Sequence, residues 1–331
     1  MAEDTIPKNL TMVVDPSGDV ILVVGDTTLG KNIQVSSHVL SLASTVFKAM
    51  FSPHFQEGQR IKASSESAVK ISLPDDDPEA AGLACKILHH TIDNTLENPN
   101  LGLLAKLATF ADKYDCARSL RPSTQRWIHN LQSGTNPAGY YDLLVLSYLF
   151  DDPELFQKLT RNMVLEYGGS FQQFVSEHGQ EILPVFVARK SILALRAITK
   201  LTKVVALEEK RAKLRARVVS ALQDINDSFT RCSHVNTTKE INIAAYSREL
   251  YRIRVYPTLL TAGVTTILDR FRNFKSLAVV KCEVGACATR VDTSVATREI
   301  AAEANSWAEG ICLECVRNAG RQAGKCRIPH T

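Results

Sequence analysis

The chain has 331 residues, of which 45% are hydrophobic and 22% are charged, a composition that supports two or three folded domains. Its 39 basic and 35 acidic side chains leave a net charge of +4, too near balance to attract nucleic acid or acidic lipid over the whole surface. The N-terminus is polar, and charged residues interrupt the apolar stretch 182–198. We therefore predict no signal peptide, no membrane span and an intracellular protein that is cytoplasmic, nuclear or both.

The segment 19–35 carries the first predicted elements. Its apolar, β-branched run 19–24 and the alternating run 33–35 are separated by a break at Gly25 and Asp26. Two such runs around a turn indicate a pair of strands joined as in a hairpin.

The glycine and lysine spacing between Gly25 and Asn32 is like that of a phosphate-binding loop. Nucleotide binding through such a loop needs a Ser or Thr hydroxyl directly after Lys31 and a helix beyond it. Here Asn32 follows the lysine, and an alternating strand pattern comes next. We therefore interpret the glycines as turn residues that tolerate positive φ, with nucleotide binding left as the alternative.

Two short helices are predicted next, over 36–43 and 45–51. Ser36 or Ser37 can cap the first of them. The residues expected to share its apolar face are Val39, Leu42 and Ala43. The second helix offers a core Val46, Phe47, Met50 and Phe51. An exposed acidic turn should then lead to a third strand that ends at Leu73.

Further along, acidic residues directly before prolines predict helix starts at Asp77-Pro78 and at Asp152-Pro153. A long helical pattern runs from about 184 to 225. Its basic middle, 208–217, contains no aromatic side chains that could stack on bases, and its acidic residues lie within a turn of Lys213. We interpret it as a solvated helical face with internal ion pairs.

Several of these segments carry a resemblance to a known family. Asp19-Val20, the runs 37–40 and 44–51, Phe55-Gln56-Glu57 and the strand-to-helix step 73–80 are similar to a BTB/POZ domain, as are the helical segments 101–114 and 117–128. The resemblance implies an α+β domain over 17–131, in which helices cap a small sheet. A mostly α-helical region over 137–227 and a helical, cysteine-containing region over 228–331 should follow.

The resemblance also implies a function in protein–protein interaction, with self-association or recruitment of a partner. Phe55 and Glu57 match the hydrophobic-x-Glu motif with which some family members engage a cullin scaffold of ubiquitin ligases. Asp19 and His38 lie in other family motifs and are the further candidate partner-binding residues. The alternative for the motif is a turn whose phenylalanine packs on the domain. The C-terminal region resembles the tail that follows BTB domains in many filamentous-fungal proteins of unassigned role.

The cysteines are concentrated near the C-terminus. Six of the eight lie in the last hundred residues: Cys232, Cys282, Cys287, Cys312, Cys315 and Cys326. The two-residue spacer between Cys312 and Cys315 lets both thiolates reach one tetrahedral Zn²⁺. We predict a structural zinc site that draws its other two ligands from Cys282, Cys287, Cys232 and His234. Reduced thiols without metal and a redox dithiol are the alternatives.

Two function classes follow. The first is an adapter that binds protein partners, and the alternative is a transcription or chromatin regulator with a C-terminal zinc module. The sequence contains no finger with paired cysteine and histidine spacing, so nucleic-acid binding is not expected. It also contains no nucleophile elbow, dinucleotide turn or metalloprotease motif, so we predict that the chain is not an enzyme.

Overall fold

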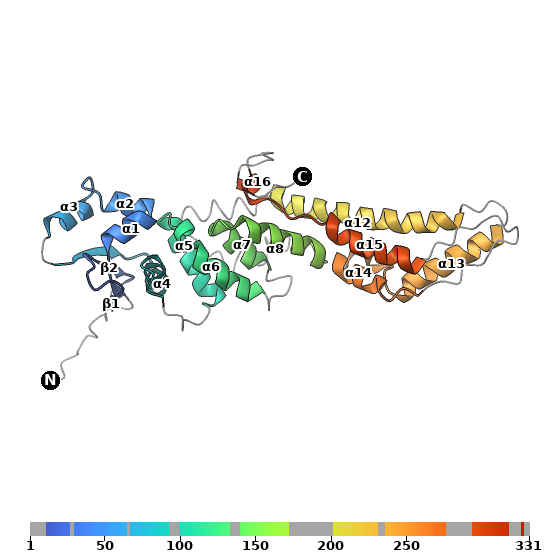
Figure 1. Ribbon diagram of the computed structural model, residues 1–331, viewed down its shortest axis with the longest axis horizontal. Coiled ribbons are helices and arrows are strands. Elements are labelled where there is room, and N and C mark those ends of the chain that lie inside the picture. The colour runs from blue at the N-terminus through green and yellow to red at the C-terminus, as the bar shows by residue number, and fades with distance from the viewer. Residues whose placement is uncertain are drawn as a thin grey trace, which may run out of the picture. The chain divides into compact units, whose positions relative to one another are not determined.

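The computed structural model describes residues 11–26, 30–64, 67–92, 99–132, 140–171, 201–230, 236–275, 293–317 and 326–327 (Figure 1). These residues fall into two compact units, the first containing those up to Pro153 and the second those from Glu154 onward. Each unit has a core of its own, and each is described separately below. Within the described ranges, no helix combines the length and apolar character that crossing a bilayer requires.

The first unit is built on a four-stranded sheet with the strand order β1-β3-β2-β4. Strands β2 (Val20–Val24) and β3 (Lys31–Val35) pair antiparallel, as predicted. Strand β4 (Val69–Leu73) is parallel to β2. A short strand that the sequence did not reveal, β1 (Thr11–Val13), is parallel to β3. Alternate residues of β2, β3 and β4 point into the core, which explains the alternating sequences of β3 and β4.

The turn between β2 and β3 excludes the phosphate-binding alternative. Gly25 has a φ of 83°, which is the positive-φ turn conformation expected of it. Lys31 opens strand β3, whereas a phosphate-binding loop would lead into a helix at this point. Residues 27–29 lie outside the described residues.

Helices cover the sheet and extend the first unit. Helix α1 (Ser37–Ala43) is capped by Ser36, and α2 (Thr45–Met50) is capped by Ser44. Helix α4 (Pro78–Leu88) begins after Asp77, whose carboxylate accepts hydrogen bonds from two amides of the first turn. Helices α5 (Leu101–Lys113), α6 (Ala117–Gln132) and α7 (Tyr140–Leu149) complete the unit. Helix α7 packs on α5 and α6. The predicted division of the chain into three regions stays a prediction.

Two local expectations in this unit were wrong. Leu40, not Leu42, is buried on α1, and Leu42 is 77% exposed. The expected acidic turn after α2 is a helix, α3 (Gln56–Ala63), whose single buried residue is Gly58. A side chain at Gly58 would meet the backbone oxygen of Ser52 at 2.0 Å, so glycine permits the helix to lie against the preceding segment.

The second unit is helical. Its longest element, α12 (Leu201–Thr230), falls in the predicted long helical pattern and carries an apolar stripe of Leu214, Val218, Leu222 and Ile225, all four of which are buried. The other elements are α8 (Pro153–Glu166), α13 (Asn236–Arg252), η1 (Thr258–Leu260), α14 (Val264–Phe271), α15 (Thr293–Trp307) and α16 (Leu313–Arg317). Helix α12 packs against α13 and α15, and α14 also packs against α15.

The first unit should depend strongly on the aromatic ring of Phe47. This ring is fully buried and stacks on Tyr114 with 4.3 Å between the ring centroids. Phe47→Ala should lower the free energy of unfolding by about 3–5 kcal/mol, because it removes buried surface and leaves a cavity. Phe55→Ala is the matched control, since its ring is 52% exposed and should cost less than about 0.5 kcal/mol. Chemical denaturation of the full chain measures both, and equal losses would contradict this assignment of the core.

Candidate functional site

Helix α1 presents the first candidate surface, and its N-terminal end is held in place by side chains from elsewhere in the unit. Both carboxylate oxygens of Asp19 accept hydrogen bonds from Ser37, one from the backbone amide at 2.7 Å and one from the hydroxyl at 2.6 Å. The amide of Ser36 donates to Nε2 of His89 at 3.1 Å, and the other ring nitrogen of His89 donates to the carbonyl of Cys85. The two amides at the start of α1 are therefore fixed to Asp19, directly before β2, and to His89 at the end of α4.

The outward side of α1 carries His38 and Leu42, both of which are exposed. Leu42 is the most exposed of the large hydrophobic side chains in the described residues. Ser119 fixes the other end of the helix, because its hydroxyl donates to the carbonyl of Ala43 at 3.0 Å. Helix α1 thus holds an apolar side chain in solvent on a backbone that is anchored at both ends.

Helix α3 presents the second candidate surface, the segment predicted to bind a cullin. Phe55 precedes the first turn, and it is 52% exposed, so a large part of it is open to solvent. The cullin motif and its alternative, a turn whose phenylalanine packs on the domain, both stay predictions. Glu57 lies half-buried in the first turn, where the helix dipole favours a negative charge. The hydrophobic and acidic members of the motif therefore sit together at a helix start.

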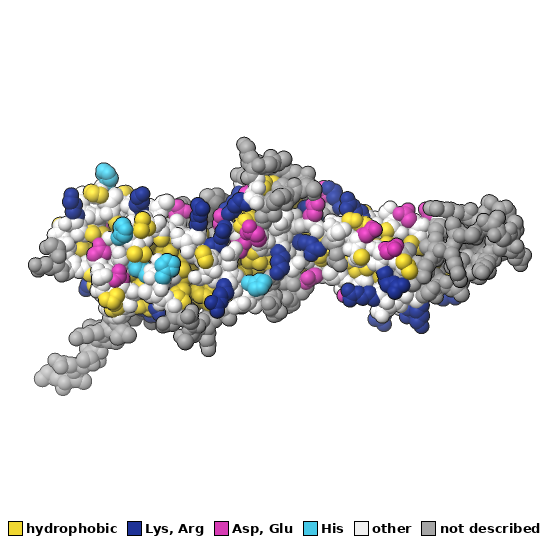
Figure 2. Space-filling view, viewed as in Figure 1, with side chains coloured by type: hydrophobic (Ala, Val, Ile, Leu, Met, Phe, Trp, Pro, Cys, Tyr) yellow, Lys and Arg dark blue, Asp and Glu magenta, His cyan; other side chains and the backbone are white. Residues whose placement is uncertain are grey.

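Figure 2 shows how side chains of different kinds are distributed over one face of the protein. Hydrophobic side chains gather over the sheet and the neighbouring helices of the first unit, whereas Lys and Arg occur in small separate groups on the second. This face carries no continuous basic field among the described residues, which is the arrangement expected from a nearly balanced charge.

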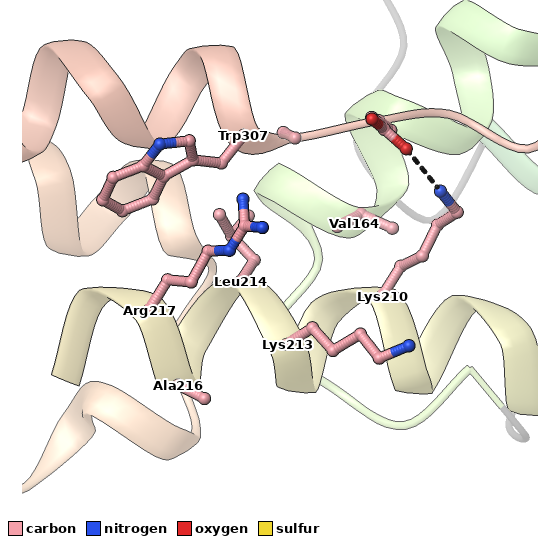
Figure 3. A pocket seen from close by; sticks show the side chains of 9 residues that line it. Val164, Lys210, Lys213, Leu214, Ala216, Arg217 and Trp307 are labelled. Atoms are coloured by element: carbon pink, nitrogen blue, oxygen red, sulfur yellow. Dashed lines mark hydrogen bonds and ion pairs between the residues drawn. The ribbon is translucent and has the colours of Figure 1, made fainter. Parts of the chain in front are cut away.

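The second unit has a groove of about 560 Å³ beside α12 (Figure 3). Lys210 forms an ion pair with Glu309 at 3.2 Å, and Lys213, which also lines the groove, pairs with Glu209 at 2.6 Å. Only the second pair is internal to the helix, as predicted for its basic middle. Arg217 lies 5.8 Å from the ring of Trp307, an aromatic partner that α15 brings to this helix from ninety positions along the chain.

A cluster of three thiols lies at the end of the second unit. The sulfur atoms of Cys312, Cys315 and Cys326 all lie within 4.8 Å of one another. Cys312 directly precedes α16, and Cys315 lies within it. Cys326 approaches from the following segment, with 3.7 Å between its sulfur and that of Cys315. Three thiols in this arrangement could hold a metal ion.

An ion pair brings Cys326 to the other two thiols. Glu314, between Cys312 and Cys315, pairs through one carboxylate oxygen with Arg327, the residue after Cys326. Its other oxygen accepts a hydrogen bond from the thiol of Cys312 at 3.2 Å. Burial raises the pKa of Cys312, so without a metal this thiol is protonated at neutral pH.

The segment before the cluster is fixed to α8 by close contacts. The amide of Ile311 donates to the hydroxyl of Thr160 at 2.8 Å, and Arg161 donates to the carbonyl of Ala308 at 3.0 Å. At Gly310 a side chain would meet the backbone oxygen of Gln157 at 1.9 Å, so only glycine allows this approach. The segment that leads into Cys312 is therefore anchored to α8.

The predicted metal ligands are divided between described and undescribed parts of the chain. Cys312 and Cys315 come together as predicted. The other four candidates, Cys232, His234, Cys282 and Cys287, lie outside the described residues, and their role stays a prediction. Cys326 was missed, because ten residues lie between it and Cys315, which matches no short ligand spacing. Cys85 and Cys116 are buried in the first unit, where burial raises the pKa of each to about 12.

Comparison with known proteins bears on the first unit. The BTB/POZ domain family model matches residues 17–128, so the domain expected there is confirmed over these residues. No curated protein matches the chain significantly. The likeness of the C-terminal region to fungal proteins stays a prediction.

Proposed function

We propose that this protein is an adapter that binds other proteins through its BTB/POZ domain. The observation that carries the proposal is the family match over 17–128, on a domain that presents the exposed side chains of Leu42 and Phe55. Apolar side chains held in solvent by a fixed backbone lose little conformational freedom when a partner covers them. The protein would therefore act through the surfaces that bind its partners.

The first partner is a second copy of the chain, bound through the outward side of α1. A two-fold contact would place Leu42 of each copy in the same interface and remove two exposed leucines from water. His38 flanks this position and would lie at the rim. Asp19 would act indirectly, since both of its oxygens are already bonded to Ser37 and position the helix.

The second partner is a cullin-type scaffold of a ubiquitin ligase, bound through the start of α3. Phe55 would insert its ring into an apolar pocket of the partner, and Glu57 would pair with a cation beside it. A large aromatic ring next to a charged group is a combination typical of residues that dominate binding energy.

The helical second unit would supply a further surface, and we propose that zinc stabilises it at the thiol cluster. Thiolate sulfur is a preferred ligand for Zn²⁺, and tetrahedral sites of this kind contribute to folding. A site fully occupied by side chains leaves no open position for water. The metal would then act on structure, as an adapter requires, and not on a substrate.

Leu42→Asp should prevent self-association, because it would bury two carboxylates against each other in the interface. The matched control is Leu260→Asp, which changes a leucine of similar exposure, 69%, in the second unit. Light scattering coupled to size-exclusion chromatography should give a dimer for the wild type and the control, and a monomer for Leu42→Asp. A wild-type chain that is monomeric at every concentration, or a dimer that persists in Leu42→Asp, would contradict dimerisation through α1.

The double variant Phe55→Ala, Glu57→Ala should weaken capture of a cullin scaffold by about tenfold or more, as loss of two central contacts predicts. The control on the same helix is Arg60→Ala, Lys62→Ala, which changes two exposed residues. Circular dichroism verifies that both variants are folded. Binding that is unchanged in the first variant, or absent in the wild type, would remove the cullin from the proposal.

A further inference from the structure

A second groove in the second unit, of about 410 Å³, lies between α12 and η1. Its lining on α12 includes Arg211, Arg215, Val219 and Gln223, which are spaced four residues apart and follow one side of the helix. This row covers about 18 Å of the helix, the length of about five extended residues. Leu260 of η1 also lines the groove. The groove is therefore long enough to receive a short segment of another chain.

Arg215 gives this groove a positive charge without a counter-ion. Its guanidinium is half-buried and donates from Nη2 to the carbonyl of Ala262 at 2.6 Å, while its buried Nε has no acceptor among the described residues. The one carboxylate in the lining, Glu208, is already paired with Arg211. A charge that is partly removed from water without a counter-ion is unfavourable, so a carboxylate in the groove would be stabilised there.

The neighbouring charges act in the same direction. Burial and the positive charge of Arg211 lower the pKa of Arg215, although an arginine remains charged at neutral pH. Two arginines and one glutamate line the groove, which leaves a single positive charge uncompensated. The electrostatics therefore favour a ligand that brings one negative charge.

The remaining lining residues suit a peptide. Leu260 is 69% exposed and Val219 is half-buried, so both can contact an apolar side chain. Ser220 and Gln223 are exposed and can form hydrogen bonds with a peptide backbone. The lining contains no aromatic side chain on which bases could stack, so it lacks the usual platform for single-stranded nucleic acid.

We propose that this groove binds a short segment of a partner protein that carries an Asp or Glu carboxylate beside a large apolar side chain. The carboxylate would pair with Arg215, and the apolar side chain would cover Leu260. This inference rests on the proposal that the protein is an adapter, and it assigns the further surface of the second unit to one groove and one class of partner.

The test selects peptides on the full chain from a phage-displayed library of random heptapeptides. We expect the enriched peptides to share an Asp or Glu next to Leu, Ile or Phe. One of them, made with a fluorescent label, should bind Arg215→Gln about tenfold more weakly than the wild type by fluorescence anisotropy, and Leu260→Ser should show a loss of similar size. The matched control is Arg217→Gln, an exposed arginine of the same helix outside this groove, and it should bind like the wild type.

Replacing the acidic residue of the peptide by its amide identifies the ion pair itself. The amide peptide should bind the wild type about tenfold more weakly than the acidic peptide, and the two peptides should bind Arg215→Gln equally, because the partner charge is already gone. Equal losses in the wild type and in Arg215→Gln would place the carboxylate elsewhere and overturn the assignment.

The failure of this inference is distinguishable from failure of the adapter proposal. Peptides that bind Arg215→Gln and Leu260→Ser as tightly as the wild type, or a folded chain that enriches none, would overturn the groove. The surfaces of the first unit would still stand, since the variants at Leu42 and Phe55 test them separately. A labelled oligothymidylate that binds the wild type but not Arg215→Gln would replace the peptide by nucleic acid and overturn the proposed class of partner.

Discussion

The stack of Phe47 on Tyr114 is the contact on which the candidate binding surfaces depend. The two rings lie parallel, and Phe51 and Phe110 pack around them. The hydroxyl of Tyr114 donates to Asp76 at 2.6 Å, and burial together with this carboxylate raises the pKa of Tyr114, so it remains a donor at neutral pH. One buried cluster thus joins α2, α5 and the turn before α4. Helices α1 and α3 flank α2 in the chain, and α1 packs against α2.

This arrangement explains how a domain with exposed apolar side chains remains folded. The N-terminal amides of α1 are satisfied by Asp19 and His89, so a partner that covers Leu42 does not have to order the helix first. The second unit follows the same principle at the thiol cluster, where hydrogen bonds to α8 fix the preceding segment before any metal binds. In both units binding groups stand on backbone that other contacts have already fixed.

The sequence predicted the elements with strong local signals and missed those defined by distant contacts. Strand β3 follows from alternation and β2 from its apolar, β-branched run, and the caps at Ser36 and Asp77 follow from side-chain chemistry. The buried face of α1 was wrong, because in a seven-residue helix a shift of two positions changes the face by about 200°. Helix α3 is polar and buries only Gly58, so no buried apolar stripe marks it in the sequence. Cys326 and Trp307 reach their partners only through tertiary structure, which no local spacing reveals.

The central claim is that α1 forms a contact between copies of this chain, and hydrogen–deuterium exchange of the full chain at different concentrations tests it most directly. The account predicts that amides over Ser37–Ala43 exchange more slowly as concentration rises, while those of the buried strand β2 are unaffected. Exchange in α1 that does not depend on concentration, in a chain that nevertheless self-associates, would place the contact elsewhere and contradict the account.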